Sequence, residues 1–178
     1  MLPFCDNFKG ERVLLRKIKS SDAEVWASWF NDSEVLKYSR HRSLRTSPEK
    51  QLIIMKNIHE DPSKVQFICE FSKRPVGVIS LIFYDNIDAA EISVIIGEKS
   101  SWGMGIASDS IKTIIDYCKK FHKVNKFFAG CDNRNIGSVK AFQKCGFKIK
   151  EIEKNSIKYP DEETLYDKTL MVFTSQEA

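Results

Sequence analysis

The chain contains 178 residues, of which 42% are apolar and 29% are charged, and its formal net charge is +4. The length predicts one domain over residues 1–178, and the composition is that of a globular domain. The net charge is too small to indicate nucleic-acid binding unless it is concentrated on one face. No apolar run approaches the ~18 residues that a membrane-spanning helix needs.

Five cysteines at wide spacings and three scattered histidines form no metal-ligand pattern. The odd number of cysteines and the absence of a C-x-x-C motif argue against both a disulfide framework and a zinc site. The N-terminus, MLPFCDNFKGERVLL, lacks the basic start and the long apolar stretch of a secretion signal. We therefore expect a cytoplasmic protein that holds no metal ion.

Strands and helices alternate along the chain. The first half predicts, in order, a strand at 12–18, a helix at 20–32, an aperiodic basic segment at 31–46, a helix at 47–61, and three strands at 65–71, 75–84 and 89–97. The second half predicts a helix at 107–121, a strand at 126–131, a helix at 135–147, and strands at 147–154 and 164–173. This order predicts an α/β or α+β domain with a mixed sheet.

Three of the helices carry clear local signals. Ser47 and Pro48 suit the N-cap and the first position of the helix at 47–61. Gly146 suits the left-handed position that follows the helix at 135–147, with Phe147 packing back on it. The helix at 107–121 has one apolar face, formed by Ala107, Ile111, Ile114, Ile115, Cys118 and Phe121.

A glycine-rich turn, GEKSSWGMGIAS at 97–108, joins a strand to that helix. Gly103 and Gly105 allow backbone N–H groups to approach an anion, and the first amides of a helix favour negative charge. The turn therefore suits a pyrophosphate, although a plain strand-to-helix turn looks the same. A dinucleotide site is a near miss, because Ser108 replaces the third glycine or alanine and Asp132 follows Gly103 by 29 residues instead of about 20.

Two longer segments together resemble the GNAT N-acetyltransferases, in particular the RimJ/RimL-like branch. They are AEISVIIGEKSSWGMGIASDSIKTIIDY, which contains W-G-x-G-x-[AG], and CDNRNIGSVKAFQKCGFK, which contains N-x-x-S and K-x-G-F. The likeness begins at GERVLLRKIKSSD and extends to the final strand. It implies a mixed, mostly antiparallel sheet of six to seven strands with helices on both faces, splayed between the strands near 91–97 and 127–131.

The resemblance also implies acetyl-CoA as a cosubstrate, bound without a metal. Its diphosphate would rest on backbone amides of Trp102, Gly103, Met104, Gly105, Ile106 and Ala107. Its pantetheine arm would pair with the backbone around Val94, Ile95 and Ile96 like an added strand. Asn135 and Ser138 match the N-x-x-S motif, so they would contact the pantetheine and the region of the sulfur. They could also be a helix N-cap and a polar residue of the first turn, but a side chain can cap and bind at once, and the pairing of the two motifs favours binding.

Acetyl transfer to an amine requires a proton acceptor and a leaving thiol. Glu91 is the candidate base, because such a glutamate often reaches the acceptor cleft in this family; it could also be a strand-end surface carboxylate. Many family members place a tyrosine acid seven residues after the motif asparagine, but this chain has Phe142 there. The resemblance to the RimL-like branch implies that a serine takes this role instead, which would make Ser138 the acid. Cys118 and Cys131 fit packing positions, so direct transfer is expected rather than a covalent enzyme intermediate.

The basic segment after the first helix is expected to line the acceptor pocket in this family. Tyr38, Arg40, His41 and Arg42 would suit an anionic acceptor, such as a nucleotide-linked amino sugar, although a solvated loop would carry the same charges. A protein N-terminus or another small amine is also a possible acceptor. We expect no nucleic-acid or membrane partner, and a monomer or a homodimer paired through terminal strands.

Two other functions fit parts of the sequence. Phe142 and the unsettled base would fit a non-catalytic acyl-CoA sensor on the same fold. The G-x-G near miss would fit a nucleotide-cofactor oxidoreductase. The acetyltransferase hypothesis explains more of the chain than either, because it accounts for both motifs and for their order.

Overall fold

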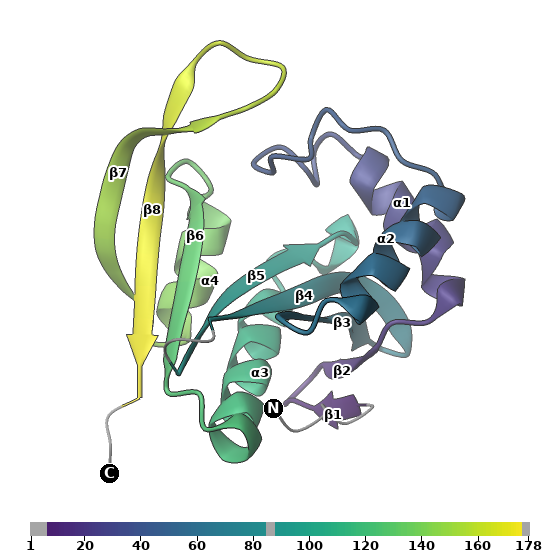
Figure 1. The fold of residues 1–178 in the computed structure, drawn as a ribbon, viewed down its shortest axis with the longest axis horizontal. Coiled ribbons are helices and arrows are strands. Elements are labelled where there is room, and N and C mark those ends of the chain that lie inside the picture. Colours follow the sequence, from purple (N-terminus) through teal and green to yellow (C-terminus); the bar gives the residue numbers. More distant parts are fainter. Residues whose placement is uncertain (1–6, 85–87, 176–178) are drawn as a thin grey trace.

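An eight-stranded mixed sheet runs through the molecule in the computed structural model, which describes residues 7–84 and 88–175 (Figure 1). The strands are β1 (Asn7–Lys9), β2 (Leu14–Lys17), β3 (Lys64–Phe71), β4 (Arg74–Tyr84), β5 (Ala89–Ile96), β6 (Lys126–Asp132), β7 (Lys148–Lys158) and β8 (Leu165–Thr174). The helices are α1 (Ala23–Asn31), α2 (Pro48–Glu60), α3 (Ile106–His122) and α4 (Ile136–Lys144), with short 3₁₀ turns η1 (Ser20–Asp22) and η2 (Lys99–Ser101).

The sheet order is β1-β2-β3-β4-β5-β6-β8-β7, and within the described residues every neighbouring pair is antiparallel except β5–β6. The mixed, mostly antiparallel fold predicted from the sequence is therefore confirmed. The predicted number of six to seven strands is too low, because β1 pairs with β2 over three residues and is too short to show alternation. The strand predicted at 147–154 continues as β7 to Lys158.

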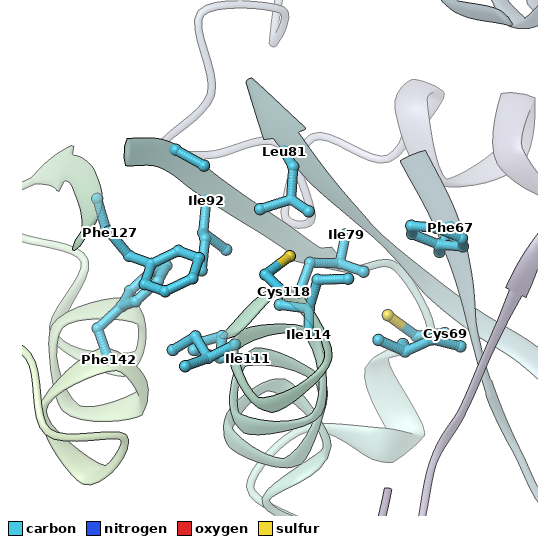
Figure 2. Packing of buried hydrophobic residues seen from close by; sticks show 14 of the residues in the cluster. Phe67, Cys69, Ile79, Leu81, Ile92, Ile111, Ile114, Cys118, Phe127 and Phe142 are labelled. Atoms are coloured by element: carbon cyan, nitrogen blue, oxygen red, sulfur yellow. The ribbon is translucent and has the colours of Figure 1, made fainter. Parts of the chain in front are cut away.

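Helices cover both faces of the sheet because the apolar residues of β3 and β4 alternate between two cores. Ile68 and Val78 face α1 and pack with Trp26 and Trp29. Phe67, Cys69, Ile79 and Leu81 belong to the opposite core beneath α3. In Figure 2, Ile111, Ile114 and Cys118 of α3 lie against Ile79, Leu81 and Ile92, and Phe142 of α4 lies beside Phe127.

The predicted apolar face of α3 is mostly buried. Ile111, Ile114 and Cys118 have exposed fractions of 0%, and burial raises the pKa of the Cys118 thiol to about 12, as expected for a packing residue. Phe121 is a correction, because its side chain is 46% exposed. It lies in the last turn of α3, and its ring packs at a tilt against that of Tyr117, with centroids 4.8 Å apart.

The helix caps follow the sequence signals. Ser47 caps α2, where its hydroxyl accepts a hydrogen bond from the Lys50 amide and Pro48 begins the helix. Gly146 follows α4 with a φ of +90°, in the left-handed region. The ring of Phe147 packs on Phe142 of α4, with centroids 5.0 Å apart. These contacts fix where both helices begin or end.

The N-terminal hairpin is tied to the start of α3 by side chains from both partners. The Asp109 carboxylate accepts hydrogen bonds from the amides of Glu11, Arg12 and Val13 at 3.1, 2.7 and 2.8 Å. The Arg12 guanidinium in turn donates to the carbonyl of Met104, in the turn that precedes α3. The turn before α3 is therefore attached to the N-terminal hairpin, through the connection between β1 and β2.

Candidate active site

The parallel pair β5–β6 opens into a wedge after only three residue pairs. Ala89, Ala90 and Glu91 pair with Lys126, Phe127 and Phe128, and the register ends there. Beyond this point β5 continues to pair with β4, and β6 with β8, while the two strands diverge toward the upper part of Figure 1. The predicted splay is thus present, and Val94, Ile95 and Ile96 lie on its β5 side.

A glycine loop, residues 102–107, connects η2 to α3 at the end of β5. Gly103 and Gly105 have φ values of +74° and +79°, which side chains rarely adopt, and a Cβ at either position would meet no atom within 4 Å. In the part of the chain that the structure describes, no oxygen accepts from the amides of Gly103, Gly105, Ile106, Ala107 and Ser108. These amides lie at the positive end of a helix dipole and can hold an anion.

Trp102 links the glycine loop to the end of β5. Its indole N–H donates to the carbonyl of Ile96 at 2.8 Å, while 43% of the side chain stays exposed. At the other end of the loop, the Ser108 hydroxyl donates to the carbonyl of Ala141 at 3.3 Å. The loop is therefore fixed to the wedge on one side and to α4 on the other.

Asn135 is the N-cap of α4, and its side-chain oxygen accepts from the Ser138 amide at 3.1 Å. The prediction that Asn135 is a helix N-cap is thus confirmed. Its side-chain nitrogen makes no hydrogen bond to any other described residue, so the residue can cap the helix and still donate to a ligand. Ser138 lies in the first turn of the same helix, half-buried.

Cys131 lies next to Ser138 at the end of β6. Burial raises the pKa of the Cys131 thiol, and the hydrogen bond with Ser138 offsets part of that rise. A thiol with a raised pKa is a poor nucleophile at neutral pH, which agrees with a packing role. Phe142 is only 3% exposed and packs in the main core, so its ring is unavailable for proton transfer.

A cavity of about 330 Å³ lies where β5 and β6 begin to diverge. Its lining includes the carboxylate of Glu91, whose Oε2 accepts a hydrogen bond from the Tyr84 hydroxyl at 2.8 Å. That hydrogen bond raises the pKa of Tyr84. The remaining lining residues come from β6, β7 and β8: Phe128, Ala129, Gly130, Lys150, Lys168, Leu170 and Met171.

Tyr84 and the two cavity lysines were not identified from the sequence. Tyr84 ends β4, where its partner across the hairpin is Ala89, and this places Glu91 on the diagonal of the same pair. The length of the connection after the strand predicted at 75–84 sets this register, so it was the sequence signal that could have predicted that Tyr84 lies near Glu91. Lys168 comes from β8, which pairs with β6, and Lys150 comes from β7, which pairs with β8; no local sequence signal predicts this strand order.

The segment between α1 and α2 lies above the wedge, near the connection between β7 and β8 (Figure 1). The Arg42 guanidinium pairs with Asp161 at 2.7 Å and with Glu162. Tyr38 lies 5.7 Å from the guanidinium carbon of Arg134. Arg40 and His41 are exposed, and Arg40 makes no ion pair within residues 7–84 and 88–175. The four predicted acceptor residues thus share one segment, but only Arg42 has its charge matched.

The wedge does not fit a dinucleotide fold. Its sheet is mostly antiparallel, whereas a dinucleotide domain needs a parallel sheet with its glycine turn after the first strand. Asp132, which would have to bind a ribose, is 1% exposed and already accepts from Arg134 and Tyr159. Among the described residues no cluster of histidine, cysteine or acidic side chains could hold a metal ion, and no helix is long and apolar enough to cross a membrane.

A gap between strands can receive an extended ligand as an added strand, and the free amides beside it can hold a diphosphate; this combination suits a coenzyme A-dependent acyltransferase. The acetyltransferase (GNAT) domain model matches residues 12–148. The chain therefore belongs to the GNAT family of acetyl-CoA-dependent N-acetyltransferases.

Individual proteins agree with this assignment. The uncharacterized N-acetyltransferase p20 of Bacillus licheniformis is 28% identical over 154 residues, which cover 81% of this chain and 85% of p20. The microcin C7 self-immunity acetyltransferase MccE, solved with acetyl-CoA and AMP, is 15% identical with a TM-score of 0.82, covering 93% of each chain. RimL, a ribosomal L7/L12 alpha-N-protein acetyltransferase solved with coenzyme A, is 15% identical with a TM-score of 0.83, covering 92% of this chain and 94% of RimL. At these identities the two solved structures show a shared fold.

Proposed function

We propose that this chain transfers an acetyl group from acetyl-CoA to an acceptor amine by direct attack of the amine nitrogen. The observation that supports this most is the wedge between β5 and β6, with the free amides of the glycine loop at its end. In this arrangement residues 102–107 hold the diphosphate, and the backbone of Val94, Ile95 and Ile96 holds the pantetheine arm. Asn135 and Ser138 flank the thioester from α4.

The reaction forms a C–N bond and breaks a C–S bond. The amine proton passes to a base, and the departing thiolate takes up a proton. A backbone amide of β5 near Val94 or Ile95 stabilises the carbonyl oxygen as it gains negative charge. Ser138 is the candidate donor for the sulfur, because Phe142 is buried and has no acidic proton. A thiol with a pKa of about 8.5 needs little help in leaving as a thiolate.

Glu91 is the proposed base, since its carboxylate lines the cavity at the narrow end of the wedge. Glu91→Gln should lower turnover by about 10²-fold near pH 6.5 and by much less near pH 9. Alkyl amines titrate near 10, so the acceptor depends most on a protein base when the pH is low. The measurement is the pH profile of kcat for the wild type and the variant.

Tyr84→Phe is the matched control for Glu91→Gln. It removes the hydrogen bond to Glu91 and leaves the carboxylate in place, so its pH profile should keep the wild-type shape with a few-fold lower rate at most. Glu91 is not the base if the two variants and the wild type show parallel profiles between pH 6 and 9.

The acceptor enters from the side of the α1–α2 segment, which contains Tyr38, Arg40, His41 and Arg42. Arg40 is the cation best placed to bind an anionic group of the acceptor, because it is exposed and Arg42 already pairs with two carboxylates. Nucleotide-linked amino sugars, protein N-termini and other small amines are the candidate acceptor classes. The paired motifs around Gly103 and Asn135, together with the shared fold of RimL, support a place in the RimJ/RimL-like branch.

Thiol release from acetyl-CoA, corrected for hydrolysis, tests this function against a panel of sugar, peptide and polyamine amines. We expect at least one amine class to raise thiol release well above the hydrolysis rate. Acetyl-CoA should also raise the melting temperature, since a ligand at 100 times its Kd adds about 2.7 kcal/mol, whereas NAD should not. Binding of acetyl-CoA without transfer to any amine would favour the sensor hypothesis instead.

A further inference from the structure

Six side chains beside the wedge form a closed ring of contacts, here called the arginine–tyrosine ring. Asp132 pairs with Arg134 at 2.7 Å, and the Arg134 guanidinium carbon lies 3.3 Å from the ring centre of Tyr166. The Tyr166 hydroxyl donates to Glu162, which pairs with Arg42. The Arg42 guanidinium carbon lies 3.9 Å from the ring centre of Tyr159, and the Tyr159 hydroxyl donates to Asp132 at 2.7 Å, which closes the ring.

The ring joins three segments that are distant in sequence. Arg42 belongs to the segment between α1 and α2, which we propose to line the acceptor site. Asp132 and Arg134 form the turn from β6 into α4, directly before Asn135. Tyr159 and Glu162 belong to the connection between β7 and β8, and Tyr166 belongs to β8. The acceptor segment is thus bound through side chains to the turn that positions Asn135 and Ser138.

The ring is anchored by a buried carboxylate. Asp132 is 1% exposed and accepts four hydrogen bonds, three from Arg134 and one from Tyr159. Burial by itself would raise the pKa of Asp132, but the hydrogen bonds outweigh it, and the pKa lies below its usual value. On the opposite side, hydrogen bonds from Tyr166 and Arg42 lower the pKa of Glu162. Both carboxylates are therefore charged at neutral pH, and both arginines have their charges matched.

We infer that the ring positions the acceptor segment relative to the thioester, so that Arg42 and Glu162 are positioning residues for the acetyl transfer proposed above. Arg42 serves this role better than direct binding of an anionic acceptor. Its side chain is 11% exposed, it contacts Asp161 and Glu162, and its flat face lies on Tyr159. A planar guanidinium can stack and pair at the same time, which a lysine cannot do.

Neighbouring glutamates provide a matched pair of variants. Glu162 belongs to the ring, whereas Glu163 has a side chain that is 98% exposed and, among the described residues, pairs only with exposed Lys158 at 3.2 Å. Glu162→Gln should speed amide exchange in the segment that carries the Ser39, Arg42 and Leu44 amides at least ten-fold, because Arg42 loses one of its two ion pairs and the link through Glu162 to Tyr166 is broken. It should raise the acceptor KM at least five-fold and leave the acetyl-CoA KM unchanged. Glu163→Gln should change none of the three.

Arg42→Lys is a second variant that keeps the positive charge, and it should behave like Glu162→Gln because it loses the stack on Tyr159. Equal exchange in Glu162→Gln and Glu163→Gln would overturn the inference. Faster exchange with an unchanged acceptor KM would also overturn it, since the ring would then be structural only. If the wild type acetylates no amine, the proposed function fails, and the exchange comparison alone still decides whether the ring holds the segment.

Discussion

Gly105→Ala is expected to raise the KM for acetyl-CoA at least ten-fold while leaving kcat at saturating acetyl-CoA nearly unchanged. Gly105 has a φ of +79° as the N-cap of α3, and an alanine there costs about 1–2 kcal/mol or forces the loop to turn. Turning the loop redirects the amides of Ile106 and Ala107, and a hydrogen bond to a charged group is worth about 1.5–3 kcal/mol. Steady-state kinetics with varied acetyl-CoA, supported by calorimetric titration, measure the effect.

Gly146→Ala separates backbone strain from loss of ligand contacts. Gly146 also has a positive φ, +90°, and an added Cβ there would lie 3.2 Å from the ring of Phe173. This variant should melt at a lower temperature than the wild type and keep the wild-type KM for acetyl-CoA. If it raises that KM as much as Gly105→Ala does, the loss reflects general destabilisation, and the glycine loop is not the diphosphate site.

Gly97→Ala is expected to lower the melting temperature by about 5–10 °C, a larger change than at either of the other two glycines. Gly97 is buried at the end of β5, and an added Cβ would lie 2.1 Å from the ring of Trp29 in α1. Trp29 is itself only 4% exposed, so it has little room to move. Overpacking of a core costs about 1–3 kcal/mol and occasionally more, and ~1 kcal/mol shifts the melting temperature of a domain this size by about 2–4 °C. Thermal unfolding followed by circular dichroism measures the change.

A second substitution at Trp29 tests whether that contact is the cause. Trp29→Phe alone should destabilise the protein, since it leaves a space in the core beneath α1. In the Gly97→Ala background it should instead restore part of the lost stability, because the smaller ring makes room for the methyl group. Simple additivity of the two losses would show that the strain lies elsewhere.

The sequence predicted the order of the elements well, because its signals are local. Alternation, the Ser47 cap and the glycine after α4 each act within a few residues of the element they define. β1 escaped prediction because three residues carry no period, and Phe121 was placed in the core because periodicity cannot show where a helix passes beyond its sheet. The GNAT fold itself was accessible through the two paired motifs, whose spacing places both at the same wedge.

In the candidate site, too, the sequence predicted the residues that lie in short motifs and missed those that only the fold brings together. The glycine loop and Asn135 lie within short motifs, and the sequence therefore pointed to them. The partners of Arg42 could not be foreseen, because Asp161 and Glu162 lie 119 and 120 positions further along the chain and meet it only through the fold. The glycines of the stretch at 97–108 are also required for two different structural reasons, which the sequence does not distinguish. Gly97 is required for space against Trp29, whereas Gly103 and Gly105 are required for their backbone angles.

The hydrogen bonds between Asp109 and the hairpin amides affect how this enzyme tolerates changes near its N-terminus. Arg12 of the N-terminal hairpin donates to Met104 in the glycine loop, and Asp109 of α3 binds the hairpin amides, so the conformation of the proposed diphosphate loop depends on the start of the chain. A shortened or bulkily fused amino terminus would then weaken the hold on coenzyme first, and only later the chemistry.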